Sequence, residues 1–184
     1  MPVVARHFVA RFGRATTQRQ LRRSPQHLGP SHIRELRVLL DRATLKGLTG
    51  VYVVVEDFDD QETRAGFDKR TFQTDVELKL GLAGIKVLSE TEYLETPGAP
   101  SLYVVVTPLH ERRGEYAAFS GMIELAQLVR LERDRSIGHS VGTWSKGWVG
   151  VADIPVIRES VKDGVDIFIN AWLRMNPKPQ ESDP

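Results

Sequence analysis

The chain has 184 residues, of which 41% are hydrophobic and 27% are charged, the proportions of a soluble globular protein. It contains no cysteine, which excludes disulfides, thiolate nucleophiles and cysteine-ligated metals. No apolar run approaches the ~18 residues that a membrane-spanning helix requires, so we expect no membrane span.

The net charge of +1 is unevenly distributed. Residues 1–46 carry ten Lys and Arg against two acids, a net of +8, and the remainder carries 15 basic against 22 acidic residues, a net of −7. Residues 1–30 are acid-free and lack the apolar segment of a secretory signal. Their composition favours a disordered basic arm. A mitochondrial-type presequence, or an arm that binds nucleic acid or anionic lipid, is the alternative interpretation.

The first half of the chain predicts two helices and a strand. Ser31 can cap a helix that runs to about Thr44, so 31–46 is interpreted as a helical linker. The β-branched run at 50–56 predicts a strand. Asp68 can cap a helix whose apolar positions repeat at helical spacing, and Gly84 is suited to its carboxyl end. Residues 85–88 can form a short strand.

The second half predicts three more strands and a closing helix. Residues 102–107 form a strand, and 110–115 are typical of a hairpin loop. The segment 116–131 fits both a helix and a strand, and we choose a strand because its neighbours on both sides are strands. A glycine-interrupted strand follows at 141–151. The last helix starts after Asp153 and stops at Asn176-Pro177.

These elements predict an α+β fold in β-α-β-β-β-α order. One mainly antiparallel sheet of four to five strands carries two main helices on one face, with an additional amino-terminal helix. We expect a basic arm at 1–30, a linker at 31–46, a single domain at 47–176 and a disordered tail at 177–184.

Strand alternation divides the predicted sheet into an aliphatic face and an aromatic face. We assign to the aliphatic, helix-covered face Val51, Val53, Val55, Leu102, Val104, Val106, Phe119, Ile123, Leu125, Val149 and Val151. An open aromatic platform can bind a ligand or partner, because aromatic rings with polar tips favour half-wet surfaces and Lys146 places a cation near two indoles. The alternatives are that the helix at 31–44 or a second subunit covers it, or that a bulge at Gly147 breaks the strand parity. Its predicted members are Tyr52, Tyr103, Tyr116, Trp144, Lys146 and Trp148.

Two motifs invite a catalytic interpretation. Residues 138–142 match G-x-S-x-G, but no buried strand precedes the motif, no helix follows it and no histidine lies beyond His139. The acidic residues Asp57, Asp59 and Asp60 follow a hydrophobic strand and could hold a divalent metal, although a solvated loop is the simpler interpretation. We predict no catalytic residue and no cofactor.

The chain resembles an uncharacterised bacterial family of small, exported α+β proteins over residues 45–178. In that family an export signal precedes the first strand, whereas this chain has its arginine-rich arm there. The order of elements is also similar to the amino-terminal domain of TolB and to lipopolysaccharide-assembly lipoproteins. The runs that carry the family resemblance are Leu-Thr-Gly-Val-Tyr-Val-Val-Val-Glu-Asp (48–57), Thr-Asp-Val-Glu-Leu-Lys-Leu (74–80), Ala-Gly-Ile-Lys-Val (83–87), Thr-Trp-Ser (143–145), Ile-Arg-Glu-Ser-Val-Lys-Asp (157–163), Asp-Ile-Phe-Ile-Asn-Ala-Trp-Leu (166–173) and Asn-Pro (176–177).

The sequence therefore predicts a non-enzymatic binding or assembly module that acts through the aromatic face or a strand edge. Its expected partner is a protein or a second copy of the chain, and the resemblance implies an exported or periplasmic location in the bacterial envelope. The alternatives are a metal-dependent enzyme that uses the acidic loop at 56–60 and a nucleic-acid-binding protein that uses the basic arm.

Overall fold

The structure is a computed structural model that describes residues 39–109 and 117–177. Three predicted features lie outside these residues: the arm at 1–30, the hairpin loop at 110–115 and the tail from 178 onward. The chain divides into two units, residues 1–39 and 40–184, and the elements below belong to the second. Of the predicted helix at 31–44, the described part is helical at 39–43.

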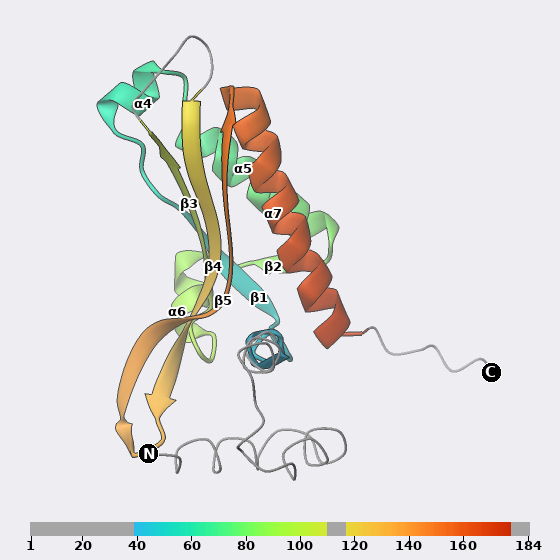
Figure 1. Cartoon of the computed structure of the whole chain (residues 1–184). Coiled ribbons are helices and arrows are strands. Elements are labelled where there is room, and N and C mark those ends of the chain that lie inside the picture. The colour runs from blue at the N-terminus through green and yellow to red at the C-terminus, as the bar shows by residue number, and fades with distance from the viewer. Residues whose placement is uncertain (1–38, 110–116, 178–184) are drawn as a thin grey trace, which may run out of the picture. The chain divides into compact units, whose positions relative to one another are not determined.

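The fold is α+β, as predicted, with a five-stranded mixed sheet in the order β2-β1-β3-β4-β5 (Figure 1). β1 runs parallel to both of its neighbours, and β3, β4 and β5 are antiparallel. Of the ambiguous segment at 116–131, the described residues 117–131 form a strand, which confirms the choice made from its neighbours. The strands are β1 (Gly50–Val55), β2 (Lys86–Val87), β3 (Ser101–Pro108), β4 (Ala117–Leu131) and β5 (Asp134–Ala152).

Two main helices cover one face of the sheet: α5 (Lys69–Leu82) and α7 (Ile154–Met175) (Figure 1). Both predicted caps are confirmed, since the Asp68 side chain accepts from the Arg70 amide and the Asp153 side chain from the Val156 amide. Gly84 follows α5 with a φ of 79°, a conformation that favours glycine.

Two short helices were not predicted: α4 (Asp60–Arg64) and α6 (Glu90–Glu95). Each begins with a reciprocal capping box, formed by Asp59 with Glu62 in α4 and by Ser89 with Glu92 in α6. Neither helix buries a residue, so neither segment shows in its sequence the apolar stripe by which longer helices are recognised.

The core lies between the sheet and the two main helices. The inward positions of β1 and β3 are aliphatic and buried, as predicted from strand alternation. Phe72, Val76 and Leu80 of α5 and Ile157, Val161, Val165 and Phe168 of α7 meet them. Each such side chain contributes ~1.5–3 kcal/mol of transfer free energy, which makes this layer the main source of stability.

Ion pairs join the outer surfaces of α5 and α7. The guanidinium of Arg158 makes two hydrogen bonds to the carboxylate of Asp75, with an Nη2–Oδ1 distance of 2.7 Å. One turn further along α5, Lys79 Nζ lies 2.5 and 2.6 Å from the carboxylate oxygens of Asp166. These pairs identify the side of α7 that faces α5.

The segment that leads into β1 is tied to the carboxyl end of α7. Asn176 Oδ1 accepts a 2.7 Å hydrogen bond from the Gly47 amide, and its Nδ2 donates to the Leu45 carbonyl at 2.9 Å. Trp172 Nε1 donates to the Leu48 carbonyl at 2.8 Å. Leu45 itself is fully buried, so the core begins before the first strand.

β4 and β5 form a hairpin that continues past the other strands. β5 begins at Asp134, seven residues before the predicted start at 141, because it pairs with β4 almost to the turn. A register shift between Leu125 and Ala126 of β4 makes Thr143 the extra residue on β5. Beyond this bulge the two strands curve away from the sheet (Figure 1).

Candidate functional site

The cross-strand register shows which face of the sheet each β5 side chain occupies. Residues paired directly across two strands lie on the same face. Trp144 pairs with the buried Leu125, so it points toward the helices, and only 7% of it is exposed. Its indole meets the Phe168 ring edge-on, with 5.2 Å between centroids. Trp144 is a core residue and does not belong to an open aromatic platform.

Trp148 and Lys146 lie on the same, helix-covered face. Trp148 pairs with Gly121 and its Nε1 donates a 3.1 Å hydrogen bond to Ser160 Oγ of α7. A Cβ placed on Gly164 would lie 2.8 Å from the Trp148 ring, which explains a glycine in the middle of this helix. Lys146 pairs with Ile123, and its side chain is exposed at the margin of this face.

The predicted division of the sheet is therefore wrong on β5. Val149 and Val151, which were assigned to the helix-covered face, pair with Ser120 and Ala118 and are 82% and 73% exposed. Alternation correctly separates the two sides of each strand, but it does not determine which side joins the core. That choice depends on the register with the neighbouring strand.

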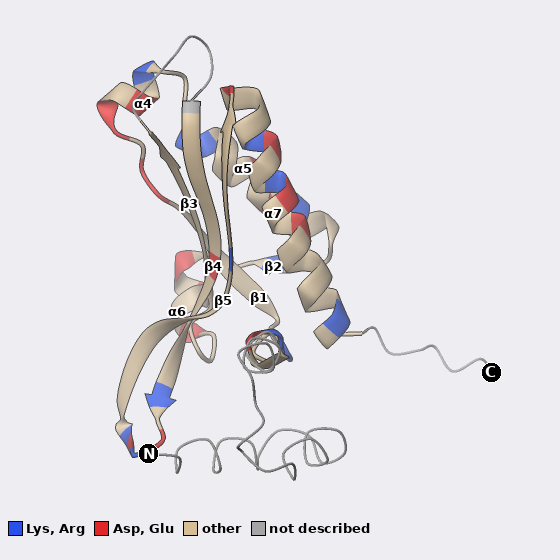
Figure 2. Cartoon of the chain, viewed as in Figure 1, with Lys and Arg blue, Asp and Glu red and all other residues tan. Residues whose placement is uncertain are grey.

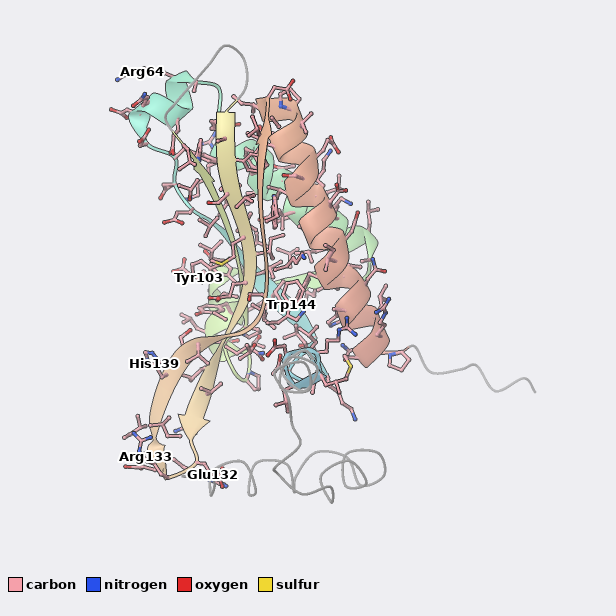
Figure 3. All side chains as sticks on the ribbon, in the orientation of Figure 1. Arg64, Tyr103, Glu132, Arg133, His139 and Trp144 are labelled. Atoms are coloured by element: carbon pink, nitrogen blue, oxygen red, sulfur yellow. The ribbon has the colours of Figure 1, made fainter. Side chains whose placement is uncertain are left out.

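The three tyrosines of the predicted aromatic platform remain to be placed. Tyr52 and Tyr103 lie on the face opposite the main helices, as predicted, and Tyr116 is outside the described residues. The Tyr52 ring contacts Tyr93 of α6, with centroids 5.2 Å apart, so α6 covers the β1 end of this face. Figure 3 shows Tyr103 and Trp144 on opposite sides of the sheet.

We call the uncovered part of this surface the open face. It is formed by outward side chains of β1, β3, β4 and β5, which the register places side by side. Most of these side chains are apolar, and several of them are exposed to solvent. Its apolar members are Val54, Tyr103, Val105, Met122, Val149 and Val151. A contiguous exposed apolar surface of this kind is characteristic of an interaction site.

Acidic residues concentrate on α4, on the loop before it and on α6 (Figure 2). The carboxylate of Glu92 accepts hydrogen bonds from Lys86 Nζ at 2.5 Å and from the Ser89 amide and hydroxyl, which lowers its pKa to about 2. Glu92 is therefore ionised at neutral pH. The helices α5 and α7 each supply one basic and one acidic residue to the two ion pairs between them.

The three acids proposed as a metal alternative are engaged locally. Asp57 pairs with Lys69 Nζ at 2.6 Å, and Asp59 caps α4 by accepting from the Glu62 amide at 2.7 Å. Asp60 lies in the first turn of α4, 3.8 Å from Arg64. Within residues 39–109 and 117–177, no group of three or more histidines and acids is arranged to hold a metal ion. These contacts give no support to a metal centre.

The G-x-S-x-G sequence lies in the curved hairpin. Residues 138–140 are exposed, and the motif is part of the continuous strand β5 rather than a turn between a strand and a helix. His139 and Ser140 pair with Val129 and Leu128 across the hairpin. The geometry of a nucleophile elbow is absent at this motif.

The outer edge of β5 is the second uncovered feature. β5 is the last strand in the sheet, and no strand of the described residues pairs with its other side. Sequence reasoning considered a strand edge but did not identify β5, and it missed Met122, Val149 and Val151 as surface residues. Gly150, which shares the parity of Trp144 and Trp148, was the available signal, because a Cβ there would lie 2.9 Å from the Phe119 ring and a glycine inside a strand marks close packing.

No family model matches the sequence, and no curated protein matches it. A structure that resembles the chain is the crystal structure of a minor lipoprotein from Acinetobacter baumannii, with 10% sequence identity over 70% of this chain and 92% of that one, and a TM-score of 0.29. This likeness is limited to the level of the fold and carries no functional assignment. In the described part of the chain, no helix is both long and apolar enough to cross a bilayer.

Proposed function

We propose that this protein is a non-enzymatic module that binds a protein partner through the open face. The observation that carries this proposal is the exposure of Val149 and Val151 on β5, 82% and 73%, on the same face as the exposed Met122 of the neighbouring β4 and Tyr103 of β3. Burying a valine contributes ~1.5–3 kcal/mol, so these side chains favour contact with an apolar surface over water.

The composition of the open face indicates the kind of partner. Its centre is aliphatic with one tyrosine, and Glu124 is its acidic member on β4. The acidic helix α6 covers the β1 end of this face, and α4 is a second acidic helix (Figure 2). A partner that presents an apolar patch with basic residues at its rim complements this surface, because charges at a rim steer association and exclude wrong partners.

The cellular setting belongs to the same proposal. The sequence resemblance implies a bacterial envelope location, where small α+β domains act in assembly. Fractionation of the cells that make the protein tests this part separately, since a binding module can act in any compartment.

The metal-enzyme alternative is less well supported than binding, because Asp57, Asp59 and Asp60 each have a local partner. The nucleic-acid alternative depends on residues 1–30, which are outside the described residues. A steep loss of oligonucleotide affinity with added salt, abolished by deleting residues 1–30, would favour it over the open face.

A photocrosslinking side chain at position 149 of the full-length protein tests the proposal in the cells that make it. Leu82, at the end of α5, is a matched control because it is 81% exposed and lies away from the open face. We expect a discrete crosslinked protein from position 149 and none from position 82. The same products from both positions, or none from position 149, would overturn the proposal.

A further inference from the structure

We propose that two copies of this chain associate edge to edge through β5, so that their sheets join into one continuous sheet of ten strands. The inference concerns the strand edge and not the open face, so it can fail without the proposed function. An edge strand presents unpaired backbone N–H and C=O groups, and antiparallel pairing with a second copy satisfies them.

The composition of β5 is the first reason. Soluble proteins protect sheet edges with lysines, prolines, inward charges or short strands. Between Ser136 and Ala152 the strand contains no proline and no acid, and Lys146 is its one Lys or Arg. Two such edges meet without like-charge repulsion along most of their length. The bulge at Thr143 limits regular pairing to the nine residues from Trp144 to Ala152.

The position of α7 is the second reason. α7 packs against both β4 and β5, so its axis lies above the gap between them. Strands are spaced by ~4.8 Å, and edge-to-edge pairing therefore places the two α7 helices about two spacings apart, roughly 10 Å. Packed helices lie about 8–10 Å apart. The joined sheets thus bring α7 against its copy at a packing distance.

The side of α7 above the β5 edge is suited to this contact. Arg158 and Asp166 identify the side that faces α5, and Ser160, bonded to Trp148, faces β5. Val156 and Ile167 lie at i−4 and i+7 from Ser160, on the same stripe. They are 55% and 44% exposed, although they are apolar.

The position of α7 relative to Trp148 favours one location for the two-fold axis. Trp148 touches α7 at Ser160 and Gly164, so the stretch of α7 beside Trp148 is centred near residue 162. Val156 precedes this centre by six residues and Ile167 follows it by five. A two-fold axis through Trp148 therefore places Val156 of one copy against Ile167 of the other. The same axis places Gly147 of one β5 opposite Val149 of the other.

The solution mass of the full-length protein, followed by sedimentation over roughly 1–100 µM, tests the dimer. We expect a dimer whose dissociation constant rises about tenfold or more in Val156→Lys and in Ile167→Lys. Both residues are exposed, so both variants should fold. Leu82→Lys is the control and should leave the constant unchanged. A monomer at every concentration, or a dimer unaffected by both α7 variants, would overturn the inference.

Engineered cysteines test the register, because the natural chain contains none. A mixture of Gly147→Cys and Val149→Cys proteins should form a disulfide between the two variants more readily than either variant does alone, since opposed residues of an antiparallel pair lie within disulfide reach. A Leu82→Cys protein should remain uncrosslinked. Equal crosslinking of all samples would exclude the proposed axis.

The two proposals give different results at position 149. A monomeric protein that still crosslinks a second kind of protein there overturns the dimer and leaves the binding function intact. A dimer whose only crosslinked product at position 149 is its own copy supports the edge pairing and counts against the binding function.

Discussion

Trp148 and Gly164 are in direct contact across the interface between β5 and α7. A Cβ on Gly164 would lie 2.8 Å from Cη2 of the indole and 2.9 Å from Cδ1 of Ile123. The absence of a side chain at 164 therefore lets the indole reach Ser160 and close the core under α7. The helix accepts the conformational cost of a central glycine because the contact requires it.

Gly164→Ala should consequently lower stability although alanine favours helices. Overpacking costs about 1–3 kcal/mol and the gain in helix propensity is about 1 kcal/mol, so we expect a net loss of about 1 kcal/mol. Gly81→Ala in α5 is the control, since nothing lies within 4 Å of its added Cβ, and it should raise stability. Urea unfolding measures both. An equal gain in the two variants would show that Trp148 does not pack on Gly164.

Replacing Trp144 and Tyr103 distinguishes the two faces of the sheet. Trp144→Ala removes a core side chain that packs on Phe168 and should cost about 3–5 kcal/mol. Tyr103→Ala removes an exposed side chain from the open face and should cost well under half of that. Denaturant unfolding of both variants is the measurement. Similar losses would contradict the register of β3, β4 and β5.

The pair between Arg158 and Asp75 should make stability depend on pH in the acid range. The hydrogen bonds from Arg158 lower the pKa of Asp75 below its ordinary value of 3.8, although desolvation opposes this. The unfolded chain then binds more protons, so the stabilisation is fully present above pH 3.8 and is lost as pH falls through the folded pKa. Asp75→Asn should flatten the decline in unfolding free energy below about pH 4, measured by urea titration at several pH values. An unchanged slope would exclude this contribution.

Asn176 should be needed to hold the segment before β1. Its side chain makes hydrogen bonds to the Gly47 amide and to the Leu45 and Trp172 carbonyls. Asn176→Ala leaves these groups without that partner and should cost about 1–3 kcal/mol. Arg174→Ala, an exposed neighbour in the last turn of α7, is the control and should change stability by less than about 0.5 kcal/mol. Hydrogen exchange at Gly47 should accelerate only in the Asn176 variant.

The sequence alone determined the elements of this protein that depend on local chemistry. Asp68 and Asp153 predict the starts of α5 and α7 because a carboxylate can satisfy free amides at a helix start. Strand alternation separates the two sides of β1 and β3 because the side-chain period of a strand is two, and on these strands the purely aliphatic side is the buried one. The short helices α4 and α6 escaped prediction, since a helix of five or six residues with no buried side has no periodic pattern.

Only the tertiary structure decided which side of β5 faces the core. In the sequence, Trp144 and Trp148 have one strand parity and Val149 and Val151 have the other. Both sets are apolar enough to be buried. The pairing of Trp144 with Leu125, together with the space that Gly121 and Gly164 leave for Trp148, turned the tryptophans inward and the valines outward. Register is a relationship between strands, and a shift of one residue reverses it, so no pattern within a single strand contains it.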